Sequence, residues 1–93
     1  MIKHKVAVLI SGKGSNLQAL IDAATQPDYP ALIALVISNK ADAFGLTRAR
    51  NAGIHAHVIS HKDYTSREEF DAAMNILLGE YEIEFICLAG FMR

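Results

Sequence analysis

The chain has 93 residues, which is enough for one small domain. Hydrophobic residues make up 52% of it and charged residues 20%, with a formal net charge of −1, so the composition is that of a globular protein with no basic footprint for nucleic acid or for an anionic membrane. No apolar run is long enough to span a bilayer, and the single cysteine, Cys87, lies in an apolar run where we expect a buried, inert thiol in a cytoplasmic protein.

The first apolar run ends at Ile10 and predicts a strand with two buried faces, as in a parallel sheet that is covered on both sides. Gly12 and Gly14 break this strand. Helical spacing begins at Ser15, which we expect to be the N-cap of a helix, with Gln18 completing a capping box. The helix is predicted to end near residue 25, and its apolar stripe consists of Leu17, Leu20, Ile21 and Ala24.

The junction of this strand and helix is the most informative stretch of the sequence. The unpaired N–H groups of a helix N-terminus and the positive end of its macrodipole meet a loop of glycines there, and such a junction favours an anion, most often a phosphate. The alternative is a loop that only turns the chain. We predict that the residues that bind the anion are Gly12, Lys13, Gly14, Ser15 and Asn16.

Two known phosphate-binding motifs do not fit this junction. The dinucleotide motif G-x-G-x-x-G requires a third glycine where Leu17 stands, and the second strand ends in Ser38-Asn39-Lys40 instead of an acidic residue that would bind a ribose. The P-loop motif requires a lysine after its last glycine, whereas Lys13 precedes Gly14. These mismatches disfavour a nicotinamide or flavin dinucleotide and indicate a phosphate cradle of another kind.

A second apolar run, at 32–37, predicts a strand parallel to the first, because the helix between them completes a β-α-β unit. Asp42 is then expected to cap a short helix. Gly45 lies inside this helix and weakens its propensity, and Gly53 stands where a glycine commonly ends a helix.

A third strand is predicted at 54–59, with apolar residues on one face and His55 and His57 on the other, as in a half-exposed edge strand. His61 follows nearby. These histidines would be a candidate metal site only if carboxylates or cysteines completed it, and the sequence does not place such residues around them. We therefore predict no metal site.

The third helix has the clearest start signal. Thr65 with Glu68, or Ser66 with Glu69, gives a capping box, and the apolar residues that follow at helical spacing are Phe70, Ala73, Met74, Leu77, Leu78 and Tyr81. A fourth apolar run at 84–89 predicts a strand that is apolar on both faces. Because ligands bind beyond the carboxyl ends of the strands in open parallel sheets, we expect residues 12–16 and 90–93 to be neighbours at one rim.

We find no convincing catalytic set at this rim. Ser11 or Ser15 would be the candidate nucleophile, but no histidine is placed to act as its base, and the carboxylates fall mostly on helix surfaces and turns. Arg67, in the first turn of the third helix, is distinguished by its location alone. The sequence therefore predicts binding residues and no catalytic residue.

Four segments, in order along the chain, resemble the phosphoribosylglycinamide formyltransferase family, also called glycinamide ribonucleotide transformylase: ISGKGSNLQ at 10–18, ISNKADAFGL at 37–46, SRE at 66–68 and LAGFMR at 88–93. The resemblance implies transfer of a formyl group from 10-formyltetrahydrofolate to the amine of glycinamide ribonucleotide, in de novo purine (IMP) biosynthesis. It also implies that the glycine loop binds the phosphoribosyl group of the substrate, and that the folate is contacted by Arg67, Gly90, Phe91, Met92 and Arg93.

The sequence departs from the family pattern in two respects. Lys13 replaces the asparagine that usually lies between the two glycines, which adds a positive charge near the expected phosphate. The resemblance also covers only the first half of the family's domain, whose catalytic asparagine, histidine and aspartate lie in the following segment. We therefore expect the chain to be inactive by itself and to need a missing C-terminal half or a complementary chain.

We expect an open, parallel, Rossmann-like α/β sheet with strand order 3-2-1-4 and helices on both faces. Residues 1–93 would form the N-terminal, nucleotide-binding half of a formyltransferase domain, with small-molecule substrates as its ligands. Two alternatives remain open: another folate formyl enzyme, such as formyltetrahydrofolate hydrolase, or a non-catalytic phosphate- or nucleotide-binding module that folds and binds by itself.

Overall fold

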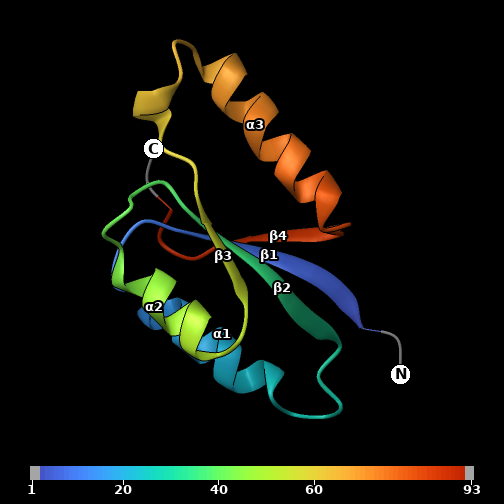
Figure 1. Ribbon diagram of the computed structural model, residues 1–93. Coiled ribbons are helices and arrows are strands. Elements are labelled where there is room, and N and C mark those ends of the chain that lie inside the picture. The colour runs from blue at the N-terminus through green and yellow to red at the C-terminus, as the bar shows by residue number, and fades with distance from the viewer. Residues whose placement is uncertain (1–2, 92–93) are drawn as a thin grey trace.

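The four apolar runs of the sequence form the four strands of one parallel sheet in the computed structural model, which describes residues 3–91 apart from the side chain of His61 (Figure 1). The elements in chain order are β1 (His4–Ile10), α1 (Ser15–Ala24), β2 (Ala31–Ser38), α2 (Phe44–Asn51), β3 (His55–Val58), a 3-10 turn (His61–Asp63), α3 (Arg67–Glu80) and β4 (Phe85–Leu88).

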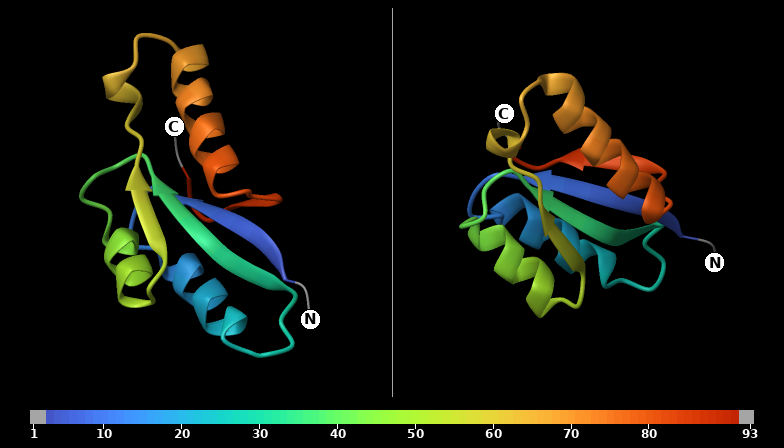
Figure 2. Two further views of the ribbon diagram at one scale, coloured as in Figure 1. Left: turned by 45° about the vertical axis from the view of Figure 1, so that its right-hand side comes forward. Right: turned by 45° about the horizontal axis from the view of Figure 1, so that its top comes forward.

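The strands lie in the order β3-β2-β1-β4, and each neighbouring pair is parallel. Helices α1 and α2 cover one face of the sheet and α3 covers the other (Figure 2). The predicted sheet type, strand order and placement of helices are thus confirmed. No helix between residues 3 and 91 has both the length and the apolar character needed to cross a lipid bilayer.

Each face of the sheet carries its own cluster of buried apolar side chains, because successive residues of a strand point to opposite faces. The α1-side core contains Val8, Ile10, Leu17, Ile21, Ile33, Val36, Ala49 and Ala89. The α3-side core contains Ala7, Leu9, Leu35, Ile37, Ile59, Phe70 and Met74. Both faces of the central strands are therefore removed from water, as their unbroken apolar runs predict.

A bulge interrupts the pairing of β1 with β2. Val6 pairs with Ile33, but the next residue, Ala7, pairs with Leu35, so Ala34 is an extra residue in β2. In a regular strand, residues two apart share a face. The bulge instead places Ile33 in the α1-side core and Leu35 in the α3-side core.

The β4 strand lies at one edge of the sheet and is poorly covered. Phe85, Ile86 and Leu88 are 57%, 51% and 69% exposed, and Cys87 is only partly buried. The expectation of a buried thiol is therefore wrong, because β4 is an edge strand and, among the described residues, pairs with β1 alone. An apolar cavity of about 220 Å³ lies next to Cys87, Phe85 and Ile86 on the α1 side.

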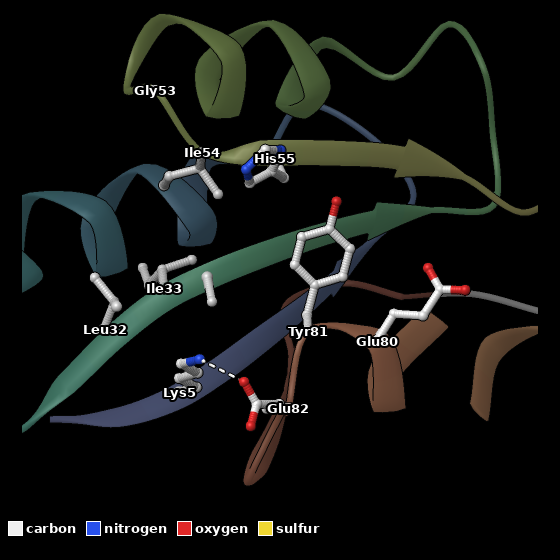
Figure 3. Close-up of a pocket in the computed structure, with 10 residues that line it drawn as sticks. Lys5, Leu32, Ile33, Gly53, Ile54, His55, Glu80, Tyr81 and Glu82 are labelled. Atoms are coloured by element: carbon white, nitrogen blue, oxygen red, sulfur yellow. Dashed lines mark hydrogen bonds and ion pairs between the residues drawn. The ribbon is translucent and has the colours of Figure 1, made fainter. Parts of the chain in front are cut away.

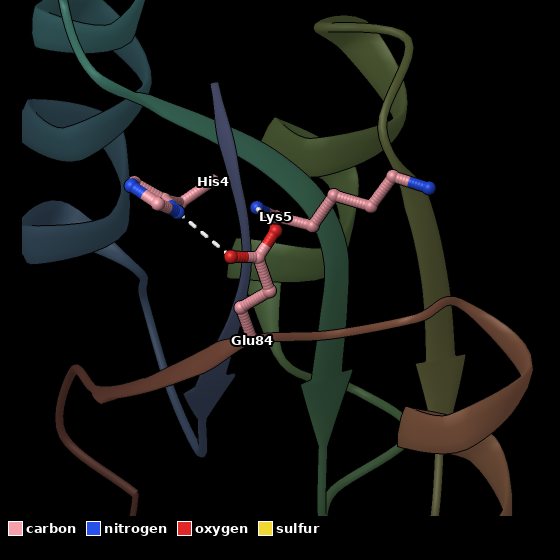
Figure 4. A network of polar contacts seen from close by, with 3 residues as sticks. All are labelled: His4, Lys5 and Glu84. Carbon is pink, nitrogen blue, oxygen red and sulfur yellow. Dashed lines mark hydrogen bonds and ion pairs between the residues drawn. The ribbon is translucent and has the colours of Figure 1, made fainter. Parts of the chain in front are cut away.

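Glu84 fixes the start of β4 against β1 (Figure 4). Its N–H donates to the Lys5 carbonyl at 2.9 Å, and its carboxylate accepts a hydrogen bond of 2.7 Å from His4 Nδ1. That hydrogen bond is the main reason why the pKa of the exposed Glu84 carboxyl is lowered. The His4 ring also meets Phe85 edge-on, with 5.5 Å between the ring centroids.

The helix caps agree with the sequence only for α3. Ser66 is the N-cap of α3, and its hydroxyl accepts a hydrogen bond of 3.2 Å from the Glu69 N–H. For α1 the expected cap at Ser15 is wrong: Gly14 is the N-cap residue and Ser15 is the first helical residue. For α2 the expected cap at Asp42 is also wrong, since Ala43 occupies that position and its extended backbone starts the helix without a side-chain cap.

Candidate functional site

The loop between β1 and α1 turns sharply at Gly14, whose φ of 77° lies in the left-handed region. A Cβ atom at Gly14 would lie 2.6 Å from the Cα of Gly45 in α2, closer than real Cβ contacts. At Gly45, a Cβ atom would collide with Ile10 Cδ1 and would lie 3.2 Å from the Cα of Gly14. The loop and α2 therefore pack backbone against backbone, which only two facing glycines permit.

Helix α1 presents its N-terminus beside this loop. The Gln18 N–H donates to the Gly14 carbonyl at 2.8 Å, whereas the first three N–H groups of a helix have no earlier carbonyl within the helix to bind. Ser15 and Asn16 are exposed, and the N-cap residue, Gly14, has no side chain that could cap this end. The positive end of the α1 macrodipole thus faces solvent at the carboxyl end of β1.

Two donors from α2 hold the loop carbonyls. The Gly45 N–H donates to the Gly12 carbonyl at 3.1 Å, and Arg48 Nε donates to the Lys13 carbonyl at 2.8 Å. Arg48 also donates to Gln18 Oε1 at 3.3 Å. Hydrogen bonds from α2 therefore help to fix the conformation of the loop.

The ends of β1 and β2 are joined by buried polar groups. Ser11 Oγ donates to Asn39 Oδ1 at 2.7 Å, and both residues are buried. This hydrogen bond links the residue that follows β1 to the residue that follows β2. Beside this pair lies a cavity of about 300 Å³ whose lining includes Lys13, Lys40 and Asp42. Lys13 of the loop and Lys40, which follows β2, thus line the same cavity.

The residues expected to contact folate fall on the α3 side or beyond the described part of the chain. Arg67 is the first residue of α3 and is exposed, and Gly90 follows β4 with a φ of 82°. Phe91 is half-buried and packs against the α3-side core. Met92 and Arg93 lie outside the described residues. The role of these five residues in folate binding stays a prediction.

The two rim segments follow neighbouring strands, as expected. β1 pairs with β4, and the Ala89 N–H donates to the Leu9 carbonyl at 2.9 Å. The glycine loop and the segment that begins at Gly90 therefore both leave the sheet at the carboxyl ends of its strands.

The histidines of β3 contact an aromatic side chain. His57 Nε2 and the Tyr81 hydroxyl are 2.9 Å apart, and the His55 ring lies 5.3 Å from the Tyr81 ring between centroids. Tyr81 reaches across from the end of α3 toward β3 (Figure 3). No group of three or more potential metal ligands occurs among the described residues, and the histidines have a packing role that the sequence did not reveal.

The cavity drawn in Figure 3 has a volume of about 370 Å³ and is lined by residues from the amino-terminal halves of β1 and β2, the start of β3 and the end of α3. Lys5 and Glu82 form an exposed ion pair at 3.4 Å within its lining. The glycine loop lies at the opposite ends of these strands, so this cavity is not part of the predicted phosphate site.

Two residues of α2 shape the glycine loop but were not predicted from the sequence as site residues: Gly45 and Arg48. The signal for Gly45 was present, because a glycine inside a predicted helix commonly marks a close backbone contact. No comparable signal marked Arg48, whose partners are a carbonyl 35 residues earlier and a side chain 30 residues earlier.

A parallel sheet with a glycine loop and a helix N-terminus at the carboxyl end of its first strand defines an α/β protein of the open-sheet class, in which ligands commonly bind at this end of the strands. The model of the formyl transferase family matches residues 4–93, and the chain belongs to this family.

Three relatives illustrate the match. The chain is 57% identical over 91 residues to the trifunctional purine biosynthetic protein adenosine-3 of Homo sapiens, covering 98% of this chain and 9% of that protein. It is 49% identical over 89 residues to phosphoribosylglycinamide formyltransferase of Haemophilus influenzae, covering 96% of this chain and 42% of that protein. The crystal structure of phosphoribosylglycinamide formyltransferase from Brucella melitensis superposes with a TM-score of 0.95 at 45% identity, covering 98% of this chain and 47% of that one. The chain therefore spans less than half the length of these relatives.

Proposed function

We propose that this chain provides the phosphoribosyl-binding loop and part of the folate site for transfer of a formyl group from 10-formyltetrahydrofolate to the amine of glycinamide ribonucleotide, in de novo purine biosynthesis. The observation that carries the proposal is the left-handed Gly14, packed on Gly45, which opens the N-terminus of α1 to an anion. The names of the relatives support the choice of substrate, and the membership in the formyl transferase family supports the reaction type.

In this proposal the substrate phosphate accepts hydrogen bonds from the loop and from the first N–H groups of α1. Binding of the phosphate orients the glycine amine for attack on the formyl carbon, which reduces the entropy lost on reaching the transition state. We assign no catalytic role to any residue of this chain. The polarising and proton-transferring groups would come from a complementary segment, a division of labour that the partial coverage of the relatives supports.

The folate would occupy the rim between the start of α3 and the end of β4. Arg67 supplies a cation at one side and the segment 90–93 supplies backbone and apolar contacts at the other. We also propose that the protein is cytoplasmic, in keeping with the enzymes of purine biosynthesis to which it is related.

Binding of glycinamide ribonucleotide by the purified chain, measured by isothermal titration calorimetry, tests the phosphate site. The informative variant is Gly12→Asp, because a Cβ atom at Gly12 meets nothing within 4 Å and the substitution therefore adds a negative charge to the loop without a collision at Cβ. Gly12→Ala is the matched control. Gly14→Asp is unsuitable, because its effect would combine charge with the collision at Gly45.

We expect Gly12→Asp to weaken binding about tenfold, which corresponds to about 1.4 kcal/mol, because a like charge beside the phosphate disfavours its binding. Gly12→Ala should bind as the unmodified chain does. Equal affinity of Gly12→Asp and Gly12→Ala would remove the loop from the substrate site.

The reaction itself is tested by mixing the chain with a separately produced C-terminal half of the Haemophilus influenzae relative. We expect formyl transfer in the mixture and none with either part alone. Binding of glycinamide ribonucleotide without activity in the mixture would favour a non-catalytic binding module over the enzyme.

A further inference from the structure

The peptide planes of the glycine loop are oriented by α2. A trans peptide is planar, and its C=O and N–H point in opposite directions. The Gly12 carbonyl points to the Gly45 N–H and the Lys13 carbonyl points to Arg48 Nε. The N–H groups of Lys13 and Gly14, which belong to the same two peptides, are therefore directed away from α2.

We propose that Arg48 is a positioning residue for the phosphate site, an inference that rests on the proposed function. By holding the Lys13 carbonyl, Arg48 directs the Gly14 N–H to the side of the loop that is open to a ligand. Without this hydrogen bond the peptide between Lys13 and Gly14 is free to rotate, because Gly14 tolerates many backbone conformations. The Gly14 N–H would then point away from the phosphate site for part of the time.

The side chain of Arg48 is itself held in place. Its guanidinium lies over the Phe44 ring, 5.0 Å from the ring centroid, and donates to Gln18 Oε1 at 3.3 Å. Gln18 in turn donates to Asp22 Oδ1 at 2.9 Å. A planar group with donors at fixed angles suits this arrangement, whereas the ammonium of a lysine would supply a single point charge.

In this proposal Arg48 acts by orienting the peptide between Lys13 and Gly14, and a positive charge alone would not make the same contacts. Arg50, on the same helix, offers a matched control, since it carries the same charge and is exposed to solvent. Its removal changes the net charge of the chain by the same amount and leaves the contacts of Arg48 in place.

The test is titration of the purified chain with inorganic phosphate and with glycinamide ribonucleotide, followed by two-dimensional NMR of the backbone amides. In the unmodified chain we expect the signals of Lys13 and Gly14 to shift on titration. In Arg48→Ala we expect about tenfold weaker binding and loss of the Gly14 shift, the size expected for losing one charge-assisted hydrogen bond that orders the site. Arg50→Ala should bind as the unmodified chain does.

Each outcome separates the inference from the proposed function. If the unmodified chain binds neither ligand at this loop, the proposed phosphate site is wrong. If it binds and Arg48→Ala binds equally well, Arg48 has no positioning role. Full recovery of affinity and of the Gly14 shift in Arg48→Lys would also overturn the inference, because charge alone would then suffice. Circular dichroism of each variant verifies that the fold is intact.

Discussion

Replacing Gly14 by alanine is expected to destabilise the fold by several kcal/mol. The left-handed backbone at Gly14 disfavours any residue with a Cβ atom by about 1–2 kcal/mol. The new Cβ atom would also lie 2.6 Å from Gly45 Cα, which is backbone and cannot move aside as a side chain can. Such overpacking contributes about 1–3 kcal/mol more. The sum, roughly 2–5 kcal/mol, is a large fraction of the 5–15 kcal/mol typical of a domain.

Urea unfolding followed by far-ultraviolet circular dichroism measures this change, with Gly12→Ala as the control because its Cβ atom has open space. We expect the midpoint of Gly14→Ala to fall far below that of Gly12→Ala. Equal midpoints at equal slopes would refute the reasoning, since the contact between the loop and α2 would then not restrict residue 14.

Three further predictions concern other parts of the fold. In Glu84→Gln the free energy of unfolding should fall less steeply as the pH is lowered. The pKa of Glu84 is lowered in the folded chain mainly by its hydrogen bond with His4. The carboxylate therefore stabilises the fold above the ordinary glutamate pKa of about 4.3, and this stabilisation is lost as the pH falls through the lower folded pKa. Ser66→Ala should cost about 1 kcal/mol in urea unfolding, whereas Ser15→Ala should be nearly neutral, because only Ser66 caps a helix. Leu88→Lys should reduce concentration-dependent light scattering, because Leu88 is 69% exposed on an edge strand.

Each of these predictions has a result that contradicts it. Acid unfolding curves that coincide for the unmodified chain and Glu84→Gln would show that the hydrogen bond to His4 is not linked to folding. Similar losses in Ser66→Ala and Ser15→Ala would contradict the assigned caps. For the edge strand the matched control is Ile76→Lys, which removes an equally exposed apolar side chain, 65% exposed, from the surface of α3. If both lysine variants suppress scattering equally, general surface apolarity is responsible and the edge of β4 is not.

The strands and their order could be predicted from the sequence because their signals are local and strong. Unbroken apolar runs identify buried parallel strands, and the helices between them fix the parallel direction. The order 3-2-1-4 was predicted from the general pattern of doubly wound sheets. The cap of α3 was predictable for the same reason, since Ser66 and Glu69 are three residues apart.

The caps of α1 and α2 were not predictable in this way. At α1 a serine follows a glycine that adopts a left-handed conformation, and this conformation moves the start of the helix one residue earlier than the serine signal indicates. That conformation is stabilised by Gly45, which is 31 positions further along the chain. The sequence thus predicts an anion site at this loop, whereas the residues that shape the loop are evident only from the tertiary contacts.

The bulge in β2 has a consequence for changes in chain length. Because Ala34 is the extra residue, removing it would join Ile33 directly to Leu35, and regular alternation would still place these two side chains on the faces that they occupy now. Removing any one of the residues 35–37 would instead turn the side chains on one side of the gap to the opposite face. Residue 34 is therefore the position at which this strand can be shortened by one residue with its two cores intact.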